Sequence, residues 1–273
     1  YEKDYKDLTA SNVSQTVDLS IIVLAYNHVD KTRLCVESIL DNLPSKYTYE
    51  IILCNNGSTD DTGAYFDSLH LLKTMTLKVN CLSNARAVSR IAAGEYILSV
   101  NNDVIVTPGA IDNLMACMAS DSRLGMVVPT TPNISNNQST ELSYMSYRHV
   151  QAYGAMHNAG PEIMEDMARL CNPIALMRAS AIHEVGEHDP CFPFGQFSDD
   201  ALSYRLRQAG YRLAIDWGTF CYHFGSVTMR DDEEFDKHIS ISRALFFHRY
   251  KFDAWGCEEY TPPMFDFQNS NGN

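Results

Sequence analysis

The fold is decided by one stretch, Tyr96-Ile97-Leu98-Ser99-Val100-Asn101-Asn102-Asp103, in which an apolar run ends in two amides and a carboxylate. A short apolar run bounded by turn residues is typical of a buried β-strand. In open α/β sheets, ligands bind at the carboxyl ends of the strands, where Asp103 falls. A carboxylate there suits a hard cation, and therefore a metal-bound phosphate. The tripeptide alone favours a plain turn, because Asn and Asp hydrogen-bond to nearby backbone, so the rest of the chain has to decide.

Short apolar runs alternate with helical stretches on both sides of this strand. We expect strands at 19–25, 50–54, 75–80, 95–100 and 124–128. We expect helices at 29–42, 84–93 and 108–120. Such alternation predicts right-handed βαβ units and an α/β fold with a mostly parallel sheet flanked by helices.

The regular pattern breaks down after Pro129. A tyrosine- and methionine-rich stretch at 144–167 could carry substrate specificity, as long insertions on α/β scaffolds do, or could simply pack an accessory sheet. Strand character returns at 172–177, 213–215 and 219–223, around a helix at 198–209. An acidic and then amphipathic helical tail closes the chain.

The composition is that of a globular protein: 273 residues, 45% hydrophobic and 20% charged. This is enough for one large α/β domain, with or without an appendage. The net charge of -13 argues against a nucleic-acid partner, since a phosphate backbone binds through a basic face. An acidic protein binds a small phosphorylated ligand when a divalent cation neutralises the phosphates, so we expect metal dependence.

The eight cysteines are scattered without a Cys-x-x-Cys pair, and we interpret them as reduced, buried core residues. Because the sequence shows no secretory signal, we expect a cytoplasmic protein. No apolar run approaches the roughly 20 residues that span a bilayer, so any membrane contact would be peripheral, at the inner face. The chain begins at Tyr1 without a Met, which fits an excised domain whose other parts could carry an anchor.

Polar side chains follow three of the expected strands. Tyr26 and Asn27 follow the first, where a flat base could stack on the tyrosine ring. Asn55-Asn56 follow the second, before a Gly57-Ser58-Thr59-Asp60 turn that can cap the next helix. Asn101 begins the polar end of the third. Capping alone does not explain why all three strand ends carry polar groups.

In this order the motifs resemble those of a family 2 glycosyltransferase of the GT-A fold. Residues 23–27 resemble the family's opening strand, and 55–60 its Asp-Asn-Gly-Ser-Thr-Asp turn. Residues 82–86 are similar to a Ser-x-Ala-Arg segment near the diphosphate, and 101–103 to a variant Asp-x-Asp motif. The likeness continues downstream, where 185–189 and 197–205 resemble the region of the catalytic base, and 209–212 and 222–228 the last two signatures.

The resemblance implies a metal-dependent, inverting transfer of a sugar from a nucleoside-diphosphate sugar to an acceptor hydroxyl. Asp103 matches the last acid of Asp-x-Asp and would bind Mn²⁺ or Mg²⁺. His223 matches the family's late histidine and could supply a second ligand that favours Mn²⁺, or could be a plain core histidine. Asp199 matches the general base, and Asp200 is its rival, because helix geometry points only one of two adjacent carboxylates at the site.

The nucleotide is expected at the strand ends and on the Ser-x-Ala-Arg segment. The expected contacts are Ala25, Tyr26, Asn27, Asn55, Asn56, Arg86 and Asn102. The Asn-Asn-Asp-Val pattern and residues 242–250 loosely resemble bacterial rhamnosyltransferase-like members, which points to dTDP beside UDP as the donor nucleotide. The acceptor would be a glycan or a lipid-linked or protein-linked sugar, read by the irregular segment 130–169.

Several positions depart from the family pattern. Asn55 stands where an Asp usually reads the base, and Asn101 replaces the first acid of Asp-x-Asp, which leaves a weaker metal site. Ser198 replaces the acid before the base, and Cys81 and Ala87 replace a glycine and an asparagine near the phosphates. We interpret these changes as drift within an active enzyme, although they also fit weakened catalysis.

The leading hypothesis is therefore a glycosyltransferase of polysaccharide biosynthesis. We divide it into an N-terminal extension (1–18), a GT-A catalytic domain (19–228) and a helical tail (229–273). Within the catalytic domain, 19–128 would bind the nucleotide and 129–228 the acceptor. The alternative is a catalytically silent GT-A module that binds a nucleotide sugar or scaffolds a larger synthase. A dinucleotide-dependent oxidoreductase is disfavoured, because no Gly-x-Gly-x-x-Gly follows the first strand.

Overall fold

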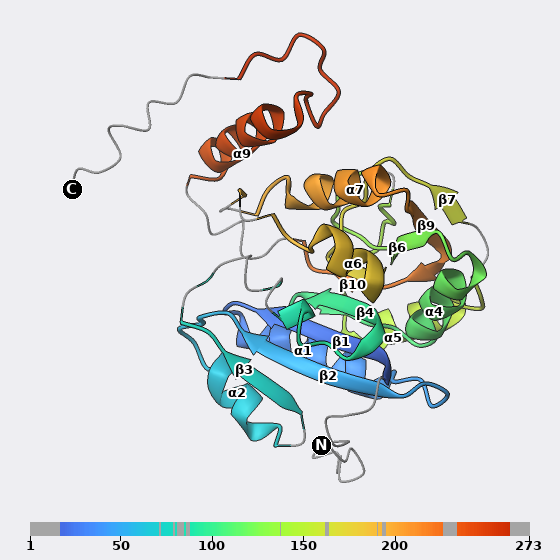
Figure 1. The fold of residues 1–273 in the computed structure, drawn as a ribbon. Coiled ribbons are helices and arrows are strands. Elements are labelled where there is room, and N and C mark those ends of the chain that lie inside the picture. The colour runs from blue at the N-terminus through green and yellow to red at the C-terminus, as the bar shows by residue number, and fades with distance from the viewer. Residues whose placement is uncertain are drawn as a thin grey trace.

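The computed structural model describes residues 17–70, 72–78, 80, 85, 88–136, 138–161, 164–189, 191–192, 195–225 and 234–262. Its centre is an eight-stranded sheet in the order β3-β2-β1-β4-β8-β6-β9-β7 (Figure 1). The strands are β1 (Val17–Ala25), β2 (Tyr49–Asn55), β3 (Lys73–Thr76), β4 (Gly94–Asn101), β6 (Leu124–Thr130), β7 (Met164–Asp166), β8 (Ile174–Arg178) and β9 (Arg212–Phe220).

The sheet is mostly parallel, as predicted. β3, β2, β1 and β4 run in one direction, and β6 and β9 follow it. Of the strands in this sheet, β8 and the edge strand β7 run the opposite way. A separate small antiparallel sheet pairs β5 (Val104–Ile105) with β10 (Tyr222–His223).

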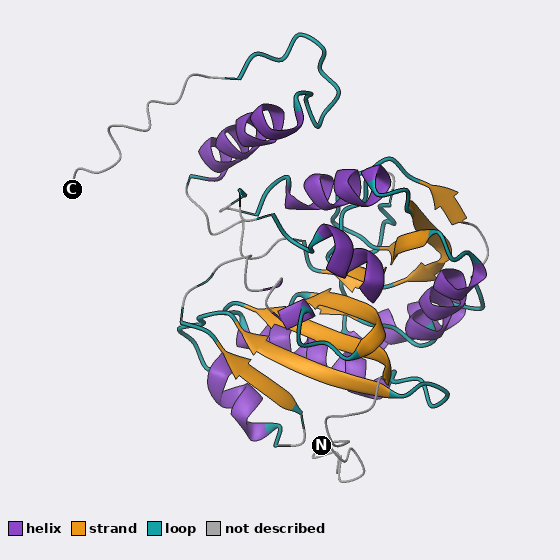
Figure 2. Cartoon of the chain, viewed as in Figure 1, coloured by secondary structure: helices purple, strands orange, loops and turns teal. Residues whose placement is uncertain are grey.

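Helices lie on both faces of the sheet (Figure 2). They are α1 (Val29–Asp41), α2 (Thr62–Ser68), α4 (Ala110–Ser120), α5 (Tyr147–His157), α6 (Ala179–Val185), α7 (Ser198–Gln208) and α9 (Phe235–Tyr250). No helix within the described ranges is long and apolar enough to cross a membrane.

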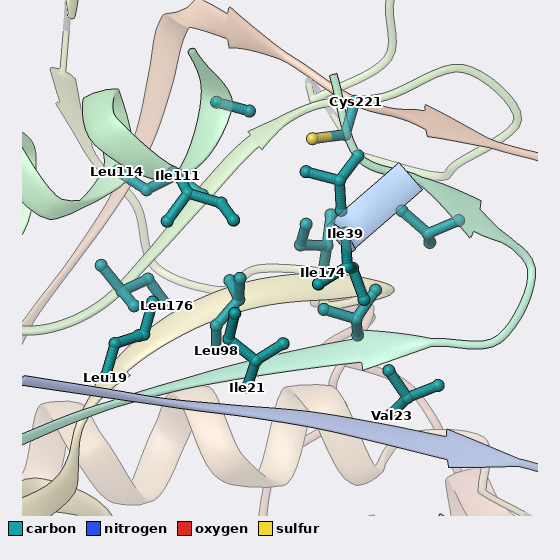
Figure 3. Close-up of a cluster of buried hydrophobic side chains, with 14 of the residues drawn as sticks. Leu19, Ile21, Val23, Ile39, Leu98, Ile111, Leu114, Ile174, Leu176 and Cys221 are labelled. Atoms are coloured by element: carbon teal, nitrogen blue, oxygen red, sulfur yellow. The ribbon is translucent and has the colours of Figure 1, made fainter. Parts of the chain in front are cut away.

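The core has two halves because β1 is apolar on both faces. Ile21 packs with Leu98, Ile39 of α1 and Leu114 of α4 in the larger cluster, shown in Figure 3. The next residue, Ile22, points to the opposite face, where α6 and α7 contribute to the second cluster. A strand buried on both sides has a continuous apolar run, which is why the sequence alone predicts this part of the sheet.

The register of the central strands brings their carboxyl ends to the same height in the sheet. Ala25 of β1 stands opposite Asn55 of β2, and Leu24 stands opposite Asn101 of β4. The three polar strand ends expected from the sequence therefore lie side by side at one edge.

In the second half the structure corrects one prediction and agrees with another. The strands expected at 213–215 and 219–223 are one strand, β9, followed by the short β10. A bulge explains the apparent gap, because Asp216 folds back to accept hydrogen bonds from Gly218 N (3.0 Å) and Thr219 Oγ1 (2.5 Å). The tyrosine-rich stretch forms α5, capped by Ser146 Oγ, which accepts from His149 N at 3.2 Å. Tyr147 and Tyr153 pack against Ile105 and Tyr222 of the small sheet, as one of the two readings of this stretch predicted.

Two smaller predictions also change. The third strand is β3, two residues earlier than expected. Of the helix expected at 84–93, residues 84, 86 and 87 lie outside the described residues; Ala85, Val88 and Ser89 are helical, and the helix ends at Ser89 and not at Ala93. The seven described cysteines are free thiols, and four of them are buried as predicted, whereas Cys191 and Cys257 are exposed.

Candidate active site

Asn27 fastens the end of β1 to the turn that follows β2. Its backbone φ of 56° and that of His28 (58°) are left-handed, which turns the chain sharply before α1. Asn27 N donates to Ser58 Oγ at 2.9 Å, and its side-chain oxygen accepts from Thr59 N at 2.8 Å. The side chain predicted to touch a nucleotide thus holds two strand ends together.

Asn102 ties the third strand end to the first. Its amide nitrogen donates to Asn27 O at 2.9 Å and to Thr32 Oγ1 at 2.8 Å, and the residue is buried. Two acceptors therefore depend on one buried amide, which fixes the turn that presents Asp103.

The two asparagines after β2 are also buried. Asn55 Oδ1, the oxygen predicted to read the base, already accepts from Ser58 N at 2.9 Å, so one of its two lone pairs is used. Asn56 Nδ2 donates to Asn80 Oδ1 at 2.8 Å. Tyr26 stays partly exposed beside them, as a stacking surface requires. Arg86 lies outside the described residues.

The structure brings together the two predicted metal ligands, which are far apart in the sequence. Asp103 precedes β5 and His223 ends β10, and the pairing of these strands places His223 opposite Val104. Phe224 N donates to Asp103 O at 3.0 Å, which locks this register. His223 Nε2 lies 3.4 Å from Asp103 Oδ2, and both residues are buried.

This pair fits a divalent cation as a partial ligand set. Two bonds of about 2.1 Å at a right angle separate their ligand atoms by about 3 Å, close to the observed separation. A carboxylate oxygen and an imidazole nitrogen are the donors that Mn²⁺ accepts readily. Across the ranges that the structure describes, no cluster of three or more His, Cys, Asp or Glu side chains forms, so phosphate oxygens and water would complete the coordination.

Asp199 lies in the first turn of α7 and is partly buried. Burial raises the pKa of Asp199 to about 7, and repulsion by Asp200 also raises it, whereas a hydrogen bond from Asn172 N (3.2 Å) and attraction by His223 lower it. The Asn172 side-chain amide also faces this carboxylate, and with its nitrogen turned inward it donates to both oxygens, at 2.6 and 3.0 Å. A carboxyl group with a pKa near 7 can exchange a proton at neutral pH.

The neighbouring acid, Asp200, forms an ion pair. Its Oδ1 pairs with Arg169 Nη1 at 2.7 Å, on the loop before β8. Of the two adjacent acids that the sequence left as rivals, Asp200 is paired with Arg169, whereas Asp199 faces Asn172.

The segment before α7 contains a second buried acid that sequence reasoning did not select. Glu187 is 2% exposed, and burial raises its pKa to about 7, although Ser89 and Ser99 donate hydrogen bonds to it. Arg205 fixes this segment through hydrogen bonds to three successive carbonyls, at Val185, Gly186 and Glu187. The likeness at 185–189 includes Glu187 but gives it no role, so the sequence analysis did not select it.

Glu187 also lines a cavity of about 380 Å³ beside α6. The lining residues are Ser89, Arg90, Ile182, His183, Gly186 and Glu187. None of the predicted site residues is among them, so this cavity is separate from the Asp103–His223 pair.

The sheet order and the site at its edge define a protein of the GT-A fold. The model of the family "Glycosyl transferase family 2" matches residues 20–186, more than half of the chain, and the chain belongs to this family.

Two curated relatives come from Pasteurella multocida. A hyaluronan synthase and, from strain Pm70, a chondroitin synthase are each 26% identical to the chain over 130 residues. That segment covers 46% of this chain and only 13% of either relative, so the chain is similar to one part of a much longer protein.

Solved structures support the fold across most of the chain. GalNAc-T7 with UDP, GalNAc and Mn²⁺ has a TM-score of 0.60 at 14% identity, covering 86% of this chain and 51% of that one. The mannosyltransferase PcManGT from Pyrobaculum calidifontis, with GDP-Man and Mn²⁺, has a TM-score of 0.61 at 13% identity, covering 93% and 68%. At such identities the likeness establishes the fold alone.

Proposed function

We propose that the protein transfers a sugar from a nucleoside-diphosphate sugar to an acceptor hydroxyl, with inversion at the anomeric carbon and with a bound Mn²⁺ or Mg²⁺. The observation that carries this proposal is the Asp103–His223 pair at the sheet edge, with the partly buried Asp199 in electrostatic contact with His223. A cation ligand set beside a carboxyl group that titrates near neutral pH is what such a transfer requires.

Asp103 and His223 would hold the cation. When bound, it neutralises the charge that develops on the diphosphate leaving group. Tyr26 would stack on the base, with Ala25, Asn55 and Arg86 close to the nucleotide. Asn27, Asn56 and Asn102 would contribute mainly by holding the strand ends, given the hydrogen bonds that their side chains or backbone already make.

Asp199 would act as the general base. Its carboxylate accepts the proton of the acceptor hydroxyl as that oxygen bonds to the anomeric carbon, and the bond from this carbon to the diphosphate breaks with its electron pair on the diphosphate. The ion pair of Asp200 with Arg169 at 2.7 Å supports the choice of Asp199 over Asp200. Asn172 would orient Asp199 through its backbone and side-chain amides.

Residues 19–128 would form the donor part and 129–228 the acceptor part of the catalytic domain. UDP and dTDP remain the proposed donor nucleotides, with a hexose or deoxyhexose as the sugar. The dTDP alternative rests on the loose likeness to rhamnosyltransferase-like proteins, and the UDP alternative gains support from GalNAc-T7, which is solved with UDP. The product would be a glycan, built on a sugar that is free, lipid-linked or protein-linked. A cytoplasmic location, at the inner face of the membrane, remains part of this proposal.

Turnover distinguishes this enzyme from a silent binding module. UDP-sugars and dTDP-sugars are incubated with the protein and Mn²⁺, and release of the nucleotide is followed with and without oligosaccharide acceptors. We expect acceptor-stimulated release that falls by roughly 10²- to 10⁴-fold in Asp199→Asn, while donor affinity is kept. Donor binding with no release from the native protein would instead identify a silent module.

A further inference from the structure

Trp255 lies beside the start of the helix that carries Asp199, and about half of its surface (52%) is exposed. Its ring centroid is 5.3 Å from that of Phe197, the residue that precedes α7. Phe197 is itself buried and adopts a left-handed backbone (φ 66°), so the contact is made to a fixed point two residues before Asp199.

The orientation of Trp255 is set by a charged pair. The Arg243 guanidinium lies 4.4 Å from the ring centroid and forms two hydrogen bonds with Asp253, at 2.7 and 2.9 Å. Planar, bidentate pairs of this kind hold their geometry better than single contacts. An exposed tryptophan held in this way offers its ring to a ligand in one orientation.

The end of α9 and Phe252, just after it, contact α7 and the loop before α7. The rings of Tyr250 and Phe252 lie 4.9 and 5.1 Å from that of Tyr204 on α7. Arg249 Nε pairs with Asp189 Oδ2 at 2.6 Å, on the loop before α7. Any molecule resting on Trp255 is therefore held at a defined place relative to Asp199.

We propose that Trp255 is a stacking platform for a sugar ring of the acceptor. The C–H face of a pyranose is attracted to the negative face of an aromatic ring, and this binding tolerates different hydroxyl patterns. The acceptor is favoured over the donor because Trp255 adjoins the helix of the base, whereas the expected nucleotide contacts lie at the ends of β1, β2 and β4. Near Trp255 in the sequence, the exposed residues include the charged Lys251, Glu258 and Glu259 and one further aromatic residue, Phe252. This inference rests on the proposed glycosyl transfer.

The chain has two tryptophans, Trp217 and Trp255, so Trp217→Phe makes fluorescence report on Trp255 alone. This variant is titrated with hexasaccharides of hyaluronan, chondroitin and cellulose at millimolar concentration, and acrylamide quenching is measured at each step. We expect at least one of them to change the emission and to slow the quenching. The inference is overturned if none does so while the donor nucleotide still binds. It is also overturned if the emission changes with protein concentration instead, because a second copy would then cover the ring.

Kinetics provide the second readout. Trp255→Ala should raise the KM for the acceptor about two- to tenfold, with kcat and donor affinity unchanged, and Trp255→Phe should restore most of the loss. An unaltered KM in Trp255→Ala contradicts the platform, whereas failure of the native protein to bind any donor contradicts the proposed function itself.

Discussion

Replacing Asp199 by Asn should remove activity and, at the same time, make the protein more stable at alkaline pH. The reason is that burial raises the pKa of this carboxyl to about 7 from an ordinary 3.8. The folded state then binds the proton more tightly than the unfolded state does. Stability from this group is fully present below the unfolded pKa and is lost as the pH rises towards 7.

The size of the effect follows from that difference in pKa. The difference corresponds to at most about 4 kcal/mol of folding free energy lost between pH 4 and pH 8. Solvent screening of the partly exposed side chain reduces this figure. An Asn cannot ionise, yet it can still accept the hydrogen bond from Asn172 N. The advantage of Asp199→Asn over the native protein should therefore grow between pH 5 and pH 8, by up to about 3 kcal/mol or roughly 5–10 °C in Tm.

Thermal unfolding of both proteins at pH 5, 6, 7 and 8 measures this advantage directly. Asp200→Asn is the matched control, because it leaves Arg169 without its carboxylate and should lower the Tm without the same dependence on pH. For the proposed transfer, kcat/KM of the native protein should rise as the pH passes through about 7, where Asp199 becomes ionised. A Tm difference between Asp199→Asn and the native protein that is constant from pH 5 to pH 8 would refute the reasoning.

Two further outcomes are expected. Asn102→Ala should lower the free energy of unfolding in urea by about 1–3 kcal/mol, because Asn27 O and Thr32 Oγ1 lose their buried donor. The control Asn101→Ala, at an exposed position, should change this free energy little. Equal effects of the two variants would contradict the role given to Asn102. Glu187→Gln should reduce the loss of stability between pH 5 and pH 8, because burial raises the pKa of Glu187 to about 7 in the folded protein. If the Tm of this variant falls with pH as steeply as that of the native protein, the pKa of Glu187 is not raised.

The first half of the fold could be predicted because local sequence and tertiary environment agree there. β1, β2 and β4 are central strands of the sheet, so their apolar runs and polar ends could be identified without knowing their neighbours. The bulge at Asp216 could not be predicted, because a polar residue inside a strand looks like the end of one.

The residues of the candidate site could be selected from the sequence, but their partners could not. Motif order selected Asp103 and His223, which the structure brings together, whereas the pairing of Asp200 with Arg169 joins residues 31 positions apart. Nor could the sequence reveal that the Asn102 side chain donates to the backbone of Asn27. Such contacts depend on the register between neighbouring strands, which is determined only when the sheet assembles.

Calorimetric titration of UDP, dTDP, GDP and CDP, each with Mn²⁺ and again with chelator, tests the proposed donor site most directly. We predict that one nucleotide, UDP or dTDP, binds to the native protein only when Mn²⁺ is present. We also predict that Asp103→Ala and His223→Ala weaken this binding by at least about tenfold, as the loss of a metal ligand should. Binding of equal strength in chelator, or in Asp103→Ala, would contradict the metal site, and no binding of any nucleotide would contradict the donor site itself.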